Sequence, residues 1–70
     1  MELGAYIKAK RKKYGLSQVE LAMRASVGVR FIKDMESGKP TLQLDKVNQV
    51  LYLFGEELAP QKINANDEKS

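Results

Sequence analysis

Cysteine and histidine, the side chains that most often bind metals or carry protons, are both absent from the 70-residue chain. Without cysteine the chain can form neither a disulfide nor a thiolate metal site. Without histidine it also lacks the commonest general base and metal ligand. We therefore expect no catalytic residues, no metal centre and no cofactor, and the chain is not expected to be an enzyme.

Long apolar runs are absent as well. No stretch approaches the roughly 18 consecutive apolar residues that a membrane-spanning helix needs, and the N-terminal residues lack the apolar core of a secretion signal. We expect a cytoplasmic protein with no membrane partner. A chain of 70 residues makes one small domain with a marginal core. Dimerisation is a common way for such a domain to bury more apolar surface.

The charges that are present are distributed unevenly along the chain. Residues 1–39 contain nine Lys and Arg against four Asp and Glu, a net charge of +5, whereas residues 40–70 contain three against five, a net charge of −2. A basic front half fits a face that meets a polyanion, but an ordinary solvated helix face produces the same excess. Charge alone leaves both interpretations open.

Apolar spacing and helix-ending residues predict four short helices and no other regular structure before residue 55. Glycine follows three of these helices, as it often does at helix ends, and Pro40 prevents the third from continuing. A short strand is expected at 56–59. The domain is thus expected to span 1–59, with a flexible polar tail at 60–70. The predicted helices cover residues 3–14, 18–25, 29–37, and 42 or 43 to 54.

The four letters SQVE at residues 17–20 form a capping box. The Ser17 side chain can accept a hydrogen bond from the Glu20 amide, and the Glu20 side chain can accept one from the Ser17 amide. Gly15 ends the first helix only two residues before this box. So short a connection predicts that the first and second helices cross at a steep angle.

The residues that follow have the spacing of a helix-turn-helix motif. Starting from Gln18, a small residue at Ala22 lets two helices cross closely, Ser26 occupies the turn, and Ile32 and Met35 lock the third helix onto the second. The turn position usually holds glycine because its φ is often positive, and serine adopts that conformation at a cost of about 1 kcal/mol. A helix presented in this way fits the DNA major groove, which is about 12 Å wide.

The segments AKRKKYGLSQVELA and DMESGKPTL resemble the Cro/C1 (XRE) class of helix-turn-helix DNA-binding proteins, and the resemblance covers about residues 3–55. It implies an all-α fold, a compact four-helix lambda-repressor-like domain, to which the strand expected at 56–59 would add a short C-terminal dimerisation strand. The longer segment ESGKPTLQLDKVNQVLYLFG is similar to the HipB-like antitoxin subgroup. This likeness implies a nucleoid-associated repressor that binds palindromic operator DNA as a homodimer and autoregulates a toxin–antitoxin operon. Its further partner is then a HipA-type kinase toxin.

Two other functions remain open on the sequence. The first alternative is a free-standing regulator of the phage or restriction-controller type. The second is a protein-interaction module that uses the same fold without binding an operator. Salt dependence separates DNA binding from protein docking, because duplex affinity falls steeply with salt when phosphates are bound.

The resemblance assigns DNA contacts to the outer face of the third helix and to the residues on either side of it. Arg30 can pair with a guanine and Val29 can pack on a thymine methyl, although a solvated helix face is the alternative. Phe31 is expected to pack beneath the helix. The expected base-reading residues are Val29, Arg30, Lys33 and Asp34. The expected phosphate-binding residues are Ser17, Gln18, Lys39 and Thr41.

Other residues are expected to hold the domain together. Arg11 falls on the apolar stripe of the first helix and Glu36 ends the third, and in the XRE class these positions form a partly buried ion pair. Arg11 is therefore interpreted as structural. The run of lysines around it (Lys10, Lys12 and Lys13) stays ambiguous between a solvated face and long-range attraction of DNA. The strand at 56–59 is expected to pair with its symmetry mate. The expected dimer interface consists of Tyr52, Leu53, Phe54 and Leu58.

Overall fold

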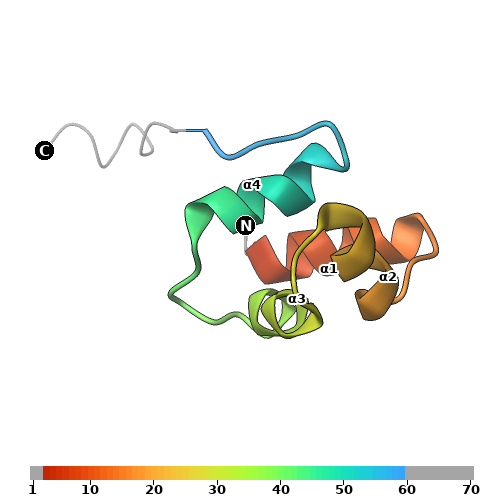
Figure 1. Ribbon diagram of the computed structural model, residues 1–70, viewed down its shortest axis with the longest axis horizontal. Coiled ribbons are helices and arrows are strands. Elements are labelled where there is room, and N and C mark those ends of the chain that lie inside the picture. The colour runs from red at the N-terminus through yellow and green to blue at the C-terminus, as the bar shows by residue number, and fades with distance from the viewer. Residues whose placement is uncertain (1–2, 60–70) are drawn as a thin grey trace, which may run out of the picture.

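The computed structural model describes residues 3–59 of the chain. Within this range the chain forms α1 (Leu3–Lys13), α2 (Gln18–Ala25), α3 (Val29–Glu36) and α4 (Leu44–Tyr52), shown in Figure 1. The four predicted helices and the all-α fold are confirmed, with helix ends that differ from the prediction by no more than two residues. The predicted tail at 60–70 lies outside the described residues. None of the helices in residues 3–59 has the length and apolarity needed to cross a membrane.

The core contains apolar side chains from all four helices. Ile7 of α1, Leu21 of α2, Ile32 of α3 and Val50 of α4 are each fully buried there. The helices have only 8 to 11 residues, which is shorter than the roughly 12 to 15 residues that an isolated helix needs in water. Packing in the common core, rather than helix propensity, therefore holds each helix in place. The remaining buried apolar residues are Ala22, Ala25, Met35, Val47 and Leu51.

The helices place α3 at one edge of the domain and α4 at the opposite edge, with α1 and α2 between them (Figure 1). The side chain of Gln49 on α4 donates to the carbonyl oxygen of Ala25 at 3.2 Å and so ties α4 to the end of α2. Because α3 lies at an edge, its outer face is open to a partner along the whole helix.

Each of these four helices is followed by a residue with positive φ. Three are glycines, and Ser26, with φ of 60°, occupies the turn between α2 and α3. The serine at this turn thus adopts the left-handed conformation that the motif predicts, which is unfavourable for a side chain. In each case the next amide donates five residues back, which is the helix-ending pattern called the Schellman motif. These bonds join Leu16 to Arg11, Val27 to Ala22, Lys39 to Asp34 and Glu56 to Leu51, at 2.9–3.0 Å.

Gly4 is the point at which α1 comes closest to the end of α3. A Cβ atom at this position would overlap the carbonyl oxygen of Met35 and press against that of Glu36. Glycine is therefore needed here for close backbone approach rather than for a turn. Sequence reasoning missed this role, because Gly4 lies inside a helix where no cap or turn is needed.

The expected strand at 56–59 is not present in the single chain. Side chains bind this segment instead: the Leu58 amide donates to Asn48 Oδ1 on α4 at 2.7 Å, so an amide that an edge strand would offer is already used. The Tyr6 hydroxyl donates to Glu56 Oε2, and Lys10 Nζ lies 3.3 Å from the same oxygen. These contacts hold the segment against α1 and α4.

Candidate nucleic-acid interface

The capping box at the start of α2 is confirmed. Ser17 Oγ accepts from the Glu20 amide at 3.0 Å, and Glu20 Oε1 accepts from the Ser17 amide at 2.8 Å. The bond from the Ser17 amide is the main reason that the pKa of Glu20 is lowered from its ordinary value. The box fixes where α2 begins and leaves Ser17 exposed at the surface.

Arg11 joins α1 to α3 and to the turn that precedes α2. Its Nε donates to Glu36 Oε2 at 2.7 Å and its Nη2 donates to Glu36 Oε1 at 3.0 Å, which makes a two-point ion pair. Its Nη1 donates to the carbonyl oxygen of Leu16 at 2.8 Å. The Arg11 and Glu36 side chains are only 11% and 5% exposed. Arg11 therefore points into the domain, and its guanidinium is largely covered.

Gln18 belongs to the same hydrogen-bond network. Its Nε2 donates to Glu36 Oε1 at 3.2 Å, so the first residue of α2 is oriented by the last residue of α3. Burial raises the pKa of Glu36, but hydrogen bonds from Arg11 and Gln18 outweigh burial and hold this pKa below its ordinary value. The sequence did not indicate the link between Gln18 and Glu36, which depends on how α2 and α3 pack in the folded domain.

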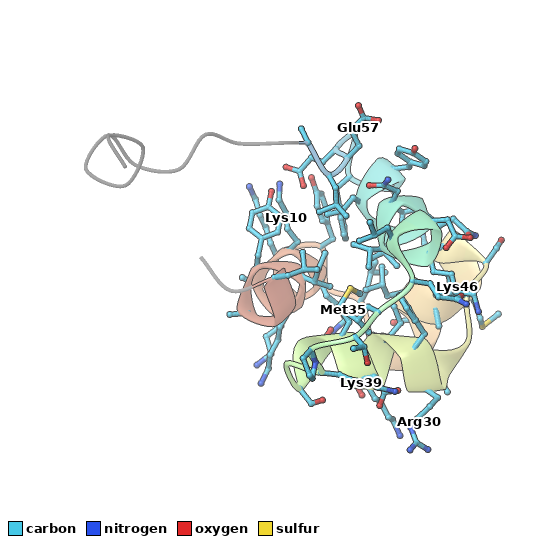
Figure 2. All side chains as sticks on the ribbon, turned by 90° about the vertical axis from the view of Figure 1, so that its left-hand side faces the viewer. Lys10, Arg30, Met35, Lys39, Lys46 and Glu57 are labelled. Carbon is cyan, nitrogen blue, oxygen red and sulfur yellow. The ribbon has the colours of Figure 1, made fainter. Side chains whose placement is uncertain are left out.

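The outer face of α3 carries the expected base-reading residues. The Arg30 side chain is 86% exposed, Lys33 is exposed, and Val29 is partly buried. Phe31 packs partly against the core, as expected. Figure 2 shows Arg30 and Lys39 at the α3 edge of the domain, with Glu57 at the opposite edge. This face is therefore cationic and open.

Asp34 lies between two of these cations. Its Oδ1 accepts from Arg30 Nε at 3.3 Å, and its Oδ2 lies 3.6 Å from Lys39 Nζ. Lys39 and Thr41 lie in the connection between α3 and α4, and both are exposed. The phosphate-binding candidates are thus divided between the start of α2 and the chain that follows α3.

The apolar residues expected at a dimer interface lie on two different surfaces. Leu53 and Phe54 line one hollow, where the Phe54 ring stacks on Tyr14 with centroids 5.3 Å apart. Leu58 lines a second hollow with Leu3. Tyr52 is 58% exposed on the outer side of α4.

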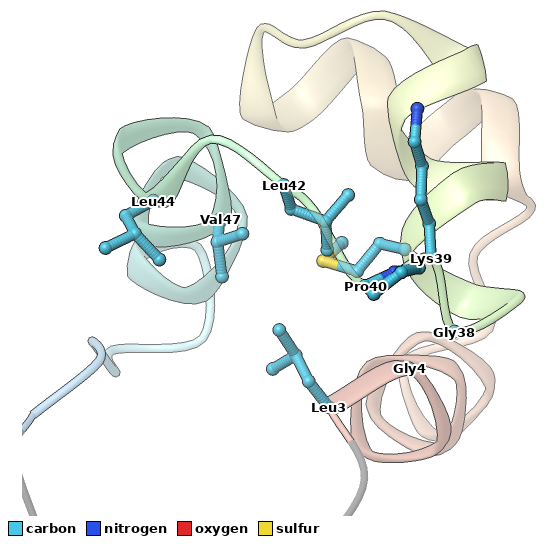
Figure 3. Close-up of a pocket in the computed structure, with 9 residues that line it drawn as sticks. Leu3, Gly4, Gly38, Lys39, Pro40, Leu42, Leu44 and Val47 are labelled. Carbon is cyan, nitrogen blue, oxygen red and sulfur yellow. The ribbon is translucent and has the colours of Figure 1, made fainter.

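Leu44 is exposed although it belongs to the apolar stripe of α4. The apolar stripe of the fourth helix places it inward, yet its side chain is 67% exposed. It opens α4 at the rim of a hollow of about 280 Å³ that Leu3 and Val47 also line, shown in Figure 3. The first turn of α4 extends beyond the core, so a residue on the apolar stripe remains uncovered there.

Comparison with known proteins assigns the chain to a family. A family model described as helix-turn-helix matches residues 7–59, which is more than half of the chain. The chain belongs to the Cro/C1-type helix-turn-helix family. It is also similar to a protein of Sinorhizobium fredii (strain NBRC 101917 / NGR234) named "Uncharacterized HTH-type transcriptional regulator y4mF". The two are 52% identical over 54 residues, which cover 77% of this chain and 71% of that protein.

Membership of the Cro/C1-type helix-turn-helix family places the chain among DNA-binding transcriptional regulators rather than in an enzyme class. In this fold α2, the turn at Ser26 and α3 are the motif itself. The outer face of α3 is the exposed face of this motif.

We predict that Arg11→Ala or Glu36→Ala lowers the melting temperature more than Lys12→Ala, a neighbouring exposed cation on α1. Removing one partner of a buried ion pair costs about 3–5 kcal/mol, a large share of the free energy of unfolding of a small domain, about 5–15 kcal/mol. Thermal denaturation followed by circular dichroism measures the difference. The double variant should be no less stable than the worse single variant.

The same pair should make stability depend on pH. Because the pKa of folded Glu36 lies below the ordinary value of 4.5, its contribution is complete above pH of about 4.5 and is lost as the pH falls through the lower value of the folded state. The gap in melting temperature between wild type and Glu36→Gln should therefore narrow in acid.

For the alanine variants of Arg11, Glu36 and Lys12, equal and small changes in melting temperature would contradict a structural role for Arg11.

Proposed function

We propose that the protein is a sequence-specific transcriptional repressor that binds palindromic operator DNA as a dimer. The observation that carries this proposal is the position of α3 at the edge of the domain, with Arg30 86% exposed on its outer face and Lys39 beside it. An exposed helix of this size fits a major groove, and its cations are attracted to phosphates.

Arg30 is the proposed base-reading residue of greatest weight. Only its Nε is hydrogen-bonded to Asp34, so the two terminal NH₂ groups of the guanidinium can donate to O6 and N7 of a guanine. Val29 at the start of α3 is suited to pack on a thymine methyl, and Lys33 lies one turn after it. These three residues supply a hydrogen-bonding, an apolar and a cationic contact along one helix face.

Phosphate binding is proposed on both sides of α3. Ser17 and Gln18 lie at the N-terminus of α2, where backbone amides favour an anion. The bond to Glu36 fixes the Gln18 side chain, so its amide is already placed when DNA arrives. Lys39 and Thr41 are exposed in the connection between α3 and α4, from which they can hold the opposite side of the groove.

We predict that Arg30→Ala weakens operator binding by about 1–3 kcal/mol and blurs preference at one or two base pairs per half-site. Gln18→Ala should weaken binding to all sequences alike. Lys10→Ala removes one cation that lies beside Glu56, away from the α3 edge (Figure 2), and serves as the charge-matched control. Affinities are measured on duplexes that the purified protein selects from a random pool, and a palindrome with half-sites about one turn apart is expected.

Two results would contradict this reading of α3. Unchanged affinity and preference in Arg30→Ala would remove α3 from the base-reading role. Weak duplex binding with little salt dependence would favour the alternative of a protein-interaction module.

A dimer is supported by apolar side chains along one side of α4. Leu44 and Tyr52 lie on the same side of this helix, two turns apart, and are 67% and 58% exposed. Asn48 lies between them and accepts a hydrogen bond from the Leu58 amide. The Leu58 side chain, which is 38% exposed, is therefore a third exposed apolar group beside this helix. We call Leu44, Tyr52 and Leu58, with Leu3 beside them, the α4 face. Leu53 and Phe54 lie on a different surface, together with Tyr14. The proposed dimer interface is therefore the α4 face, and it does not include Leu53 or Phe54.

We predict a dimer in sedimentation velocity at tens of micromolar. Leu44→Asp or Leu58→Asp should shift the protein to monomer, because a charge would be buried between two copies of the α4 face. Leu53→Asp introduces the same charge at a residue of similar exposure, 40%, on the other surface and should remain dimeric. A monomeric wild type, or dissociation caused by Leu53→Asp alone, would contradict this interface.

The antitoxin function is proposed on narrower grounds. The segment ESGKPTLQLDKVNQVLYLFG is similar to HipB-like antitoxins, and residues 40–70 have a net charge of −2 while residues 1–39 have +5. A HipA-type kinase toxin could therefore bind the acidic part of the chain without competing with phosphate for the cations of α3. A free-standing regulator of the same family is the alternative.

We predict that the tagged protein recovers a kinase-sized partner from its native cells, and that added operator DNA does not displace this partner. The reason is that the proposed partner binds the net acidic part of the chain, whereas DNA binds the cations at the α3 edge. A control with Arg30→Ala should lose DNA and keep the partner. Recovery of operator DNA alone would indicate a free-standing regulator.

A further inference from the structure

The end of α3 places a single carboxylate between two cations on the edge that faces DNA in the proposed function. Asp34 Oδ1 lies 3.3 Å from Arg30 Nε, and Asp34 Oδ2 lies 3.6 Å from Lys39 Nζ. Arg30 is one helical turn before Asp34, so its position follows from the i,i+4 spacing of the helix. The position of Lys39, which lies beyond the end of α3, needs another explanation.

The helix-ending turn brings Lys39 back to Asp34. Gly38 has a φ of 88°, and the amide of Lys39 donates to the backbone carbonyl of Asp34 at 3.0 Å. The Ser37 hydroxyl donates to the same carbonyl oxygen at 2.9 Å. The backbone of Asp34 therefore fixes the start of the Lys39 side chain, and its carboxylate lies near the ammonium at the far end.

The three side chains are exposed to different degrees. Arg30 is 86% exposed, Lys39 is 50% exposed and Asp34 is 27% exposed. The carboxylate is thus the most covered of the three, and the cations extend past it towards the solvent. Ion pairs this exposed add little to the stability of a fold, so the arrangement calls for another explanation.

We infer that Asp34 is a positioning residue that raises the sequence specificity of DNA binding by holding Arg30 and Lys39, rather than a residue that contacts a base. The inference rests on the proposed function. Each carboxylate oxygen lies near a cation of the protein, so the folded domain already directs Asp34 towards Arg30 and Lys39 rather than outward to a base.

Two physical effects follow from holding these cations. Non-specific affinity grows with the number of cations that neutralise phosphates, and the Asp34 carboxylate offsets one of them on every sequence. At the operator, Arg30 is held through Nε while its terminal NH₂ groups stay available, so less side-chain freedom is lost when it pairs with guanine. The first effect lowers binding to all DNA, and the second restores binding only at the correct site.

Asp34→Asn tests this inference, because it keeps the shape of the side chain and removes the charge. Binding to the selected operator and to an unrelated duplex of equal length is measured over a series of salt concentrations. We expect non-specific affinity to rise and the slope of log K against log salt to steepen by about 1. The ratio of operator to non-specific affinity should fall on the order of tenfold, and Asp34→Glu should restore part of it.

Two control variants separate positioning from a change in net charge, and melting curves separate it from a loss of folding. Glu57→Gln removes one negative charge at the edge opposite α3 (Figure 2) and should leave both the slope and the ratio unchanged. In an Arg30→Ala background, Asp34→Asn should change the ratio much less, because the residue it positions is absent. Melting curves of all variants should stay close to that of the wild type.

Three results would overturn the inference. Loss of preference at a single base pair with unchanged non-specific affinity would make Asp34 a direct base reader. An unchanged slope and ratio in Asp34→Asn, with normal operator preference in the wild type, would refute the positioning role alone. A wild type without any operator preference would refute the proposed function together with this inference.

Discussion

The position of α3 depends on one carboxylate, that of Glu36. It accepts from Arg11 of α1 at 2.7 and 3.0 Å and from Gln18 of α2 at 3.2 Å, so three helices meet at the last residue of α3. The backbone at the same end of α3 lies directly against Gly4 of α1. Because the ion pair is shielded from solvent, it stabilises the domain only when both partners are present. The direction in which α3 extends from the domain is therefore set at its C-terminal end, away from the N-terminal residues that are proposed to read bases.

Local signals in the sequence predicted the helices well. The capping box at residues 17–20 and the left-handed turn at Ser26 were both predictable, because each depends on residues no more than about five positions apart. Contacts between distant segments were not predictable in the same way. Tyr6 and Glu56 are 50 residues apart, and the spacing of the residues between them carries no signal that they meet. The exposure of Leu44 has a related cause, because periodicity tells which residues share a helix face but not how far the core extends beneath it.

The sequence predicted which residues form the candidate site better than it predicted the role of each residue. Resemblance placed both Gln18 and Asp34 among the DNA contacts. In the structure Gln18 is bonded to Glu36, and Asp34 lies between Arg30 and Lys39. These pairings depend on the packing of α2 against α3 and on the turn at Gly38, which are properties of the folded chain. Motif spacing therefore identifies the surface. Only the packed domain distinguishes the side chains that face outward from those that hold them in position.

The contact of Glu56 with Tyr6 and Lys10 joins the two ends of the described chain. Release of the segment at 56–59 would also break bonds to α1 and to Asn48 of α4. Since no helix here is long enough to persist alone, fraying from this end cannot proceed independently of the core. The two ends of the described chain therefore stabilise each other, because loosening of residues 56–59 also removes the contacts that Tyr6 and Lys10 of α1 make with Glu56.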